Sequence, residues 1–414
     1  MKYKQKLAIS SLLVLALLAT LCLGCGEDED KGKTEIVIGL ITDMTGPASS
    51  LLVVGESVYY DSVDYVNKED PIEGAVIKII TWDSKYDPSR DIPGYEWLRE
   101  RGADFVYSGI PTVGDVLKET AARDEFPIVS SSPGLYQLVP PGWVLGLTPP
   151  VSWVMKGFLK WISEEDWDYD AEDRKPKIGS VGWDEPYHVD VTRAIREYVE
   201  DNPDQFEYVA GLITPMGGMS WSGEIETLKD CDYIYIPSTG LGTATFAKDY
   251  RDRGYDATYL GLDAMGAFLH LLEDKAGWDR LDGSLTAHTT LYWTDQFPIV
   301  DRCKELLSRY HPGEEETIIR NGLGYISMYF CIQMVLDLVR QTVAEVGVEN
   351  FDGQAFYDTA QKFTWTDEGL PERGYGFSEN IRYARKDLTV YEWRADVQDL
   401  MRISGWLPGD VPNP

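Results

Sequence analysis

The chain has 414 residues, of which 69 are acidic and 38 are lysine or arginine, so its formal net charge is −31. A surface this acidic repels nucleic acid and anionic membrane faces, and we expect no nucleic-acid partner. The length exceeds that of one ordinary domain and is typical of two. The four histidines are scattered without the spacing of metal ligands, so we predict no metal and no other cofactor.

The N-terminal segment has the pattern of an export signal. Three lysines precede an apolar run over residues 7–23, which is shorter than a spanning helix and is followed at once by acidic residues. The letters LCLGC, which end at Cys25, resemble the lipidation motif of bacterial lipoproteins. We therefore expect residues 1–24 to be a signal peptide, Cys25 to carry the lipid and residues 25–33 to form a solvated tether. Secretion without a lipid is the alternative.

Apolar, β-branched runs alternate with amphipathic helical stretches in the first part of the chain. One such stretch ends near Asn67, and we assign Val58, Ser62, Tyr65 and Val66 to one of its faces. The alternation predicts parallel strands joined by right-handed helical crossovers. The strands are expected over residues 36–42, 76–82, 104–109 and 127–131.

The same alternation restarts after WVLGLT (143–148), with a helix over about 151–163. The acidic segment 164–177 is expected to be only a solvated connection. A long helix over 325–343 and an extended stretch over 388–394 follow later in the chain. The fold class is therefore predicted to be α/β, with two successive doubly wound parallel sheets. The strands of the second sheet are expected over residues 178–183, 208–213, 233–238 and 258–264.

Loops rich in hydroxyls, glycines and aromatic residues follow the predicted strands of both units. Examples are SSSPG (130–134) in the first unit, and WDEPYH (183–188) and LDAMG (262–266) in the second. Ligands of open α/β sheets bind at the carboxyl ends of the strands. The two units therefore present two faces that could close on a small molecule.

Known catalytic motifs are matched poorly. SSSPG does not have the G-x-S-x-G pattern of a nucleophile elbow, and GMSWSG (218–223) misses its spacing. GLGTAT (240–245) lacks the third glycine of a dinucleotide-binding loop, and no phosphate-binding G-x-x-x-x-G-K-[ST] motif occurs. We predict that the protein is not an enzyme, and keep an exported serine hydrolase as a remote alternative.

The order of these pieces resembles the extracytoplasmic solute-binding proteins of branched-chain amino acid ABC importers, the type I periplasmic binding proteins. The resemblance runs from about Thr34 to the C-terminus and depends on the order of several short motifs. They are IVIGLITDMTGPAS (36–49), DYVNKEDPIEGAVIKIITWDSKYDP (64–88), DFVYSGIPT with FPIVSSSPG, IGSVGWDEPYHVD, DCDYIYIPSTGLG and YLGLDAMG. The double glycine usual in the second motif is missing here, and His188 replaces a glycine in the fourth.

The resemblance implies two lobes, joined by three crossovers, that close on a ligand held between them (a Venus-flytrap). Lobe 1 would comprise residues 34–148 plus 287–378, and lobe 2 residues 150–284 plus 385–414. The crossovers would fall near residues 148–151, 283–288 and 375–388.

The resemblance also assigns a role to residues of the first lobe. The loop SSSPG would grip a ligand carboxylate through main-chain N–H groups and a hydroxyl, with Ser132 and Gly134 at the contacting positions. Gly134 stands where a threonine is common, so one hydroxyl is lost. Thr112 or Val113 falls where the family has a serine, and Thr112 is the better donor.

The second lobe would supply the remaining contacts. Tyr187 matches the aromatic residue that reaches in from this lobe, and Asp263 matches the acid that receives the α-ammonium group of the ligand. Thr239 falls near a further contact, with a register uncertain by one or two residues. Trp183 is added from its position at a strand end. A helix cap at residues 130–132, packing by Tyr187 between the lobes and a solvated Asp263 are the structural alternatives.

The predicted function is capture of a small polar solute, with a branched-chain or related amino acid as the main expectation, by hinge closure between the lobes. The solute would pass to an ABC permease, and the lipid on Cys25 would hold the protein at the outer face of the cytoplasmic membrane. We expect a monomer. A same-fold binder of an amide, a urea or a small carboxylic acid, and a ligand sensor, remain as alternatives.

Overall fold

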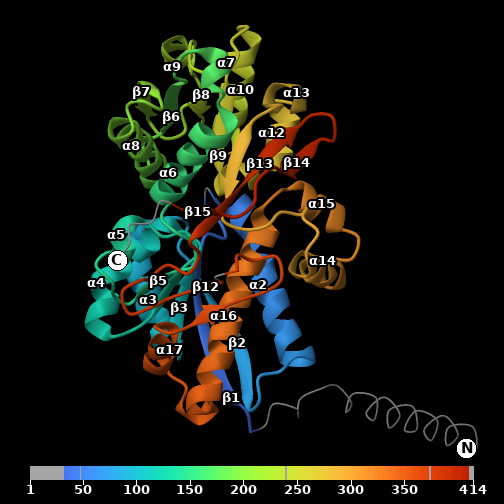
Figure 1. The fold of residues 1–414 in the computed structure, drawn as a ribbon. Helices are drawn as coiled ribbons and strands as arrows, with labels where there is room; N and C mark the ends of the chain where they lie inside the picture. The colour runs from blue at the N-terminus through green and yellow to red at the C-terminus, as the bar shows by residue number, and fades with distance from the viewer. Residues whose placement is uncertain (1–31, 47, 238–239, 373, 410–414) are drawn as a thin grey trace, which may run out of the picture.

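The computed structural model describes residues 32–46, 48–237, 240–372 and 374–409. The predicted signal peptide, Cys25 and Thr239 lie outside these ranges. The described chain forms two α/β lobes, drawn one above the other in Figure 1. Both sheets of the predicted doubly wound fold are present, which confirms the α/β class.

The first lobe is built on five parallel strands in the order β2-β1-β3-β4-β5. Side chains of β1 alternate between the two faces of this sheet, as the two-residue period of a strand requires. Ile38 and Leu40 join one apolar core, whereas Val37 and Ile41 join the other. The strands are β1 (Thr34–Thr42), β2 (Ala75–Asp83), β3 (Phe105–Ser108), β4 (Ile128–Ser130) and β5 (Val144–Gly146).

Helices cover both faces of the first sheet. The helix α2 (Ser49–Glu69) packs with the long helix α16 (Gly324–Val346) on one face, and α3 (Asp91–Arg99) and α4 (Pro111–Asp124) cover the other. Of the four residues assigned to one face of α2, Val58, Ser62 and Val66 are buried and Tyr65 is 38% exposed. The other elements of this lobe are η1 (Pro88–Arg90), α5 (Leu135–Leu138), α14 (Pro298–Tyr310), α15 (Glu315–Arg320), η3 (Val348–Asn350), α17 (Gly353–Ala360), β11 (Thr364–Trp365) and β12 (Tyr375–Gly376).

The second sheet has the order β14-β13-β10-β9-β8-β6-β7, with β15 paired to β13. Five of these strands, β10, β9, β8, β6 and β7, run parallel to one another. At the β10 edge, β13 and then β14 are added in antiparallel orientation. The predicted extended stretch near residues 388–394 is therefore a strand of this sheet. The strands are β6 (Lys177–Trp183), β7 (Glu207–Thr214), β8 (Tyr233–Tyr235), β9 (Thr258–Leu262), β10 (Leu285–His288), β13 (Asp387–Arg394), β14 (Asp399–Arg402) and β15 (Leu407–Pro408).

Two groups of helices cover the second sheet (Figure 1). Met155 and Val191 pack on one face with Tyr233 and Tyr235, because alternate side chains of β8 point to that side. The helices on this face are α6 (Val151–Trp161) and α8 (Pro186–Asp201), and those on the other are α9 (Ser222–Leu228), α10 (Leu241–Asp252) and α12 (Leu269–Lys275). The short elements of this lobe are η2 (Ile162–Asp166), α7 (Tyr169–Glu172), α11 (Asp263–Gly266) and α13 (Trp278–Leu281).

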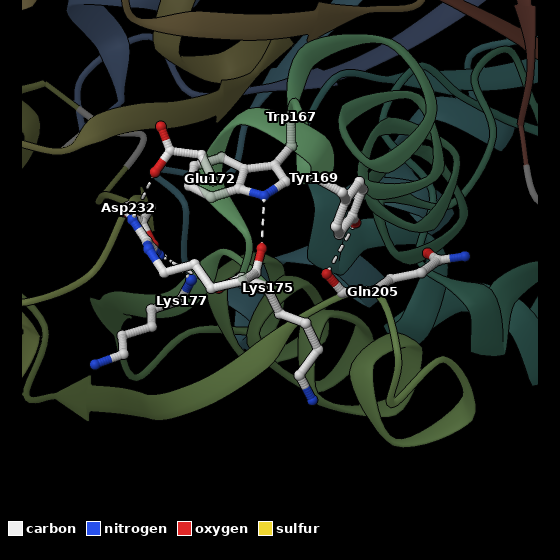
Figure 2. A network of polar contacts seen from close by, with 8 residues as sticks. Trp167, Tyr169, Glu172, Lys175, Lys177, Gln205 and Asp232 are labelled. Atoms are coloured by element: carbon white, nitrogen blue, oxygen red, sulfur yellow. Dashed lines mark hydrogen bonds and ion pairs between the residues drawn. The ribbon is translucent and has the colours of Figure 1, made fainter.

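The acidic segment over residues 164–177 is more than the solvated connection expected from its composition. Figure 2 shows it tied to the body of the second lobe by side chains from both ends. Arg174 donates to both carboxylate oxygens of Asp232, at 2.6 and 2.8 Å. The indole of Trp167 donates to the carbonyl of Arg174, and the hydroxyl of Tyr169 donates to the carbonyl of Gln205. These contacts give the segment a defined conformation while most of its acidic side chains face solvent.

The chain passes between the lobes three times, between β5 and α6, between β10 and α14, and between β12 and β13. The backbone of residue 383 pairs with Gly146 at the end of β5, so the third passage lies beside the first. None of the helices in the described part of the chain is long and apolar enough to span a bilayer.

Candidate functional site

A cavity of about 180 Å³ lies between the two lobes, where the carboxyl ends of both sheets meet. Its walls come from both lobes and from the passages that join them. The lining residues are Leu52, Gly109, Ser131, Ser132, Thr148, Pro149, Val151, Val154, Tyr187, Leu262, Asp263, Ala264, Ala267, Thr289, Leu323, Gly324, Ser327, Met328 and Cys331.

The wall from lobe 1 is rich in hydroxyl groups. Ser131 and Ser132 directly follow β4, and Gly109 follows the neighbouring strand β3. Behind this wall, the hydroxyl of Tyr107 bonds to Ser131 and lies 2.8 Å from the hydroxyl of Tyr59. This buried chain of hydrogen bonds holds Ser131, and Ser132 lines the cavity beside it.

The wall from lobe 2 presents an acid and a phenol. Asp263 directly follows β9, and Tyr187 lies in the first turn of α8. The hydroxyl of Tyr187 accepts a hydrogen bond from the backbone of Ala264, and burial raises the pKa of this phenol well above its usual value. The two side chains are therefore held together on the same side of the cavity.

The charge of Asp263 is balanced within the protein. The backbone N–H and the hydroxyl of Thr289 donate to its carboxylate, at 3.2 and 3.0 Å. Burial raises the pKa of Asp263 to about 6, while the nearby guanidinium of Arg385 opposes that shift. Asp263 is thus ionised at neutral pH, and Arg385 supplies a compensating positive charge behind the cavity.

Arg385 is itself unusual, because its guanidinium is fully buried and makes few hydrogen bonds. One of its terminal nitrogens, Nη2, lies 3.3 Å from the sulfur of Cys331, whereas Nε and Nη1 have no hydrogen-bond partner. Its guanidinium carbon lies 5.9 and 5.8 Å from the ring centres of Phe330 and Tyr375. Arg385 belongs to the third passage between the lobes, so the electrostatic balance of the cavity depends on the hinge.

The close approach of the lobes at the cavity requires a glycine. Gly322 has a φ of +101°, and a Cβ atom at this position would lie only 2.0 Å from the carbonyl oxygen of Gly266. The next residue, Leu323, donates its N–H to that same carbonyl at 2.9 Å. The N-terminal end of α16 in lobe 1 is thereby joined to α11 in lobe 2, next to Asp263.

A second cavity of about 310 Å³ adjoins the first. Ser132, Val151 and Tyr187 line both cavities, and Gly134 lines only the larger one. The larger cavity lies between α4 of lobe 1 and α8 of lobe 2, where it is lined by Asp115 and Asp190. The two cavities together form one interlobe cleft with an inner and an outer part.

The structure brings together four of the seven predicted ligand-binding residues. Ser132, Tyr187 and Asp263 line the inner cavity, and Gly134 lines the outer one. Thr112, at the start of α4, lines neither. Trp183 also lies away from both, because its indole donates to the carbonyl of Gly218 and packs in the core of lobe 2. Thr239 is outside the described residues.

Two residues near the inner cavity were missed in the sequence. Arg385 has no local signal, since its place beside Asp263 depends on the return of the chain between the lobes. Glu56 could have been found, because it shares a helix face with Leu52, Tyr59 and Val63 at the i, i+4, i+7 and i+11 positions. An acid on an apolar helix face is expected to be buried, and Glu56 is 3% exposed.

The inner cavity has groups that can bind a polar solute. Among the described residues that line it there is no histidine, so Ser131 and Ser132 have no imidazole beside them to act as a general base. Among the described residues, no group of histidine, cysteine or acidic side chains is arranged to hold a metal ion. Hydroxyl donors on one lobe and a carboxylate on the other suit a solute with both acceptor and donor groups.

Two α/β lobes with a cavity between them, lined by both polar and apolar side chains, define a solute-binding protein of the hinged, two-lobe class. The chain belongs to the periplasmic binding protein family, whose model matches residues 35–398, and it has the type I form of that fold. Proteins of this family bind small solutes outside the cytoplasm and work with ABC permeases. Among curated proteins, no sequence matches this chain.

Several solved structures share the fold at low sequence identity. A branched-chain amino acid ABC transporter protein from Thermus thermophilus with bound valine is 16% identical, with a TM-score of 0.77 over 91% of this chain and 97% of that one. A fatty acid ABC transporter substrate-binding protein from Thermomonospora curvata is 15% identical, with a TM-score of 0.74 over 92% and 94%. A solute-binding protein from Rhodopseudomonas palustris BisB5 in complex with 3,4-dihydroxybenzoic acid is 15% identical, with a TM-score of 0.71 over 93% and 99%.

Proposed function

We propose that this protein captures a small polar solute, with an α-amino acid as the leading candidate, by closing its lobes around the inner cavity. The observation that carries the proposal is the opposition of Ser132 and Asp263 across one cavity. Hydroxyl and N–H donors on lobe 1 suit a carboxylate, and the ionised Asp263 on lobe 2 suits an ammonium group. Between them, Leu52, Val154 and Met328 offer an apolar surface for an aliphatic side chain.

A small carboxylic acid without an ammonium group is the second candidate. The observation that favours it is the compensation of Asp263 by Arg385, because an aspartate that already has a counter-charge does not require a cationic ligand. The structurally similar protein in complex with 3,4-dihydroxybenzoic acid illustrates such a solute in the same fold. Tyr187 would then contact the ring of an aromatic acid.

A thermal-shift screen distinguishes these candidates, because a ligand that binds only the folded protein raises its melting temperature by mass action. The screen compares aliphatic L-amino acids, their amides, 3,4-dihydroxybenzoate and fatty acids. An amino-acid site predicts a shift with L-valine or L-leucine and none with isovalerate, which lacks the ammonium group. A shift with isovalerate equal to that with valine would favour the carboxylic-acid site, and hydrolysis of an ester substrate would favour the hydrolase.

We also propose that Cys25 is lipidated and holds the protein at the outer face of the cytoplasmic membrane. The support is the sequence LCLGC after the apolar run and the acidic segment that follows it. Mass spectrometry of the membrane fraction should find a diacylglycerol-modified N-terminal cysteine. Replacement of Cys25 by serine should release the protein from that fraction, and an unchanged distribution would contradict the anchor. We expect the released protein to be monomeric.

A further inference from the structure

Glu56 on α2 lies directly behind the lobe 1 wall of the inner cavity and has an unused hydrogen-bonding atom. Its Oε2 accepts a hydrogen bond from the hydroxyl of Thr42 at 2.5 Å, whereas Oε1 has no partner. The side chain is 3% exposed, so bulk solvent does not reach the free oxygen. A buried polar atom without a partner is costly, so an oxygen with no protein partner is available to a group from outside the chain.

The free oxygen is separated from the cavity only by a glycine. A Cβ atom on Gly109 would lie 3.2 Å from Oε1 of Glu56, 3.5 Å from the hydroxyl oxygen of Ser131 and 3.6 Å from Cδ2 of Leu52. Gly109, Ser131 and Leu52 all line the inner cavity. A ligand oxygen placed over Gly109 would therefore have a hydroxyl and a carboxyl group on either side of it.

The surroundings of Glu56 keep it protonated. The charged and titratable groups that interact with it are Asp43 after β1, Tyr59 and Tyr60 on α2, and Tyr107 on β3. All of them are acids or phenols, and among the described residues no lysine or arginine shifts the pKa of Glu56. Burial, together with the charge of Asp43, raises the pKa of Glu56 to about 8.

A neutral carboxylic acid has one proton to donate. Because the hydroxyl of Thr42 donates to Oε2, the proton on Glu56 belongs on Oε1, the oxygen beside Gly109. We propose that Glu56 is a ligand-binding residue of the cleft, and that it donates a hydrogen bond from Oε1 to a carboxylate or carbonyl oxygen of the solute over Gly109. The inference depends on the proposed function, since it concerns the same cavity, and it adds a requirement for an acceptor oxygen at this point of the solute.

Two substitutions of Glu56 test the donor role, with L-valine and 3,4-dihydroxybenzoate as the probes in isothermal titration calorimetry. Glu56→Gln retains an N–H donor and should keep the affinity at pH 7 within about threefold, whereas Glu56→Met should lower it about tenfold or more. Equal losses in both variants would mean that the ionised carboxylate accepts from the solute, and wild-type affinity in Glu56→Met would mean that the residue does not contact the solute. Either result overturns the proposal.

A glycine substitution tests the same place without touching Glu56. Gly109→Ala fills the space beside Oε1 and should lower affinity about tenfold while the protein remains folded. Gly223→Ala is the matched control, because a Cβ atom there has no neighbour within 4 Å and the site lies on α9, away from both cavities. Unchanged binding in Gly109→Ala would overturn the proposal even if Glu56→Met failed to fold.

The pH dependence separates this proposal from failure of the proposed function. The affinity of the wild type for a carboxylate should fall as the pH rises through about 8, since ionised Glu56 cannot donate, and this fall should be absent in Glu56→Gln. If the wild type binds neither probe, the proposed function fails for those solutes. Infrared spectroscopy of the free protein then decides the inference by itself. A protonated-carboxyl band at pH 7 that disappears in Glu56→Gln supports it, and ionised Glu56 overturns it.

Discussion

Replacement of Asp263 by asparagine removes a negative charge from the inner cavity and leaves its shape nearly unchanged. An amide oxygen in the place of Oδ2 can still accept from the N–H and the hydroxyl of Thr289, which lie 3.4 and 3.0 Å from that oxygen. The loss is therefore mainly electrostatic, and it affects both the solute and Arg385. For a solute whose ammonium group contacts Asp263, loss of a hydrogen bond to a charged partner corresponds to about 1.5–3 kcal/mol, or roughly ten- to a hundredfold in affinity.

The assay is isothermal titration calorimetry with the tightest-binding α-amino acid of the thermal-shift screen. Asp190→Asn is the matched control, because Asp190 lines only the outer cavity and forms an ion pair with Arg193 at 2.7 Å. Its affinity should stay within about twofold of the wild type. The unfolding free energy of Asp263→Asn should also fall by about 1–3 kcal/mol, since the buried charge of Arg385 loses its compensation.

The pH profile provides an independent check of the same reasoning. Since the pKa of Asp263 is raised to about 6, the affinity of the wild type for an amino acid should decrease as the pH falls through 6. Asp263→Asn should not show this decrease. Unchanged affinity in Asp263→Asn at pH 7 would refute contact with an ammonium group, and would leave the carboxylic-acid solute as the better candidate.

Three further predictions concern Glu56, Arg385 and Trp183. The unfolding free energy should fall as the pH rises from about 4.5 to about 8, because folded Glu56 keeps a proton that the unfolded chain releases; urea melts of Glu56→Gln should show a shallower fall, and an equal slope would contradict the raised pKa. Arg385→Met should raise the pKa of Asp263 further, because the guanidinium that opposes the shift is lost. The pH midpoint of amino-acid binding, measured by calorimetry, should therefore move upward from about 6. An unmoved midpoint would show that the two charges do not interact. Trp183→Phe should lower the unfolding free energy by about 1 kcal/mol through loss of its hydrogen bond to Gly218, with no change in affinity; a large loss of affinity would restore Trp183 as a contact.

The course of the backbone was predictable because each strand of the parallel sheets is a short apolar run bounded by polar loops. The expected strand over residues 36–42 is β1, Thr34–Thr42, and the expected helix over 325–343 is α16, Gly324–Val346. The meeting of Ser132 and Asp263 in one cavity was also predictable, because both directly follow parallel strands whose ends face the other lobe.

The parts that could not be predicted depend on side-chain direction and on contacts between distant segments. Trp183, like Ser132, lies at the carboxyl end of a parallel strand. Its side chain nevertheless points into the core of lobe 2 instead of the cleft. Position at a strand end does not determine in which direction a side chain points. Arg385 approaches Asp263 only through the third passage between the lobes. Tyr65 was assigned to the same helix face as Val58, Ser62 and Val66 on spacing alone; those three are buried, whereas Tyr65 is 38% exposed.

Neither lobe is formed by a continuous stretch of chain, and this has a consequence for how the molecule can be divided and how it folds. The first sheet is complete by residue 146, but the helix α16 that packs with α2 on one of its faces begins only at Gly324. The second sheet is likewise incomplete without β13, which pairs with β10 and begins only at Asp387. A fragment that ends at the first passage therefore exposes an apolar sheet face and should aggregate rather than fold. Because each lobe depends on contacts between segments distant in sequence, we expect slow folding that starts only when most of the chain is present.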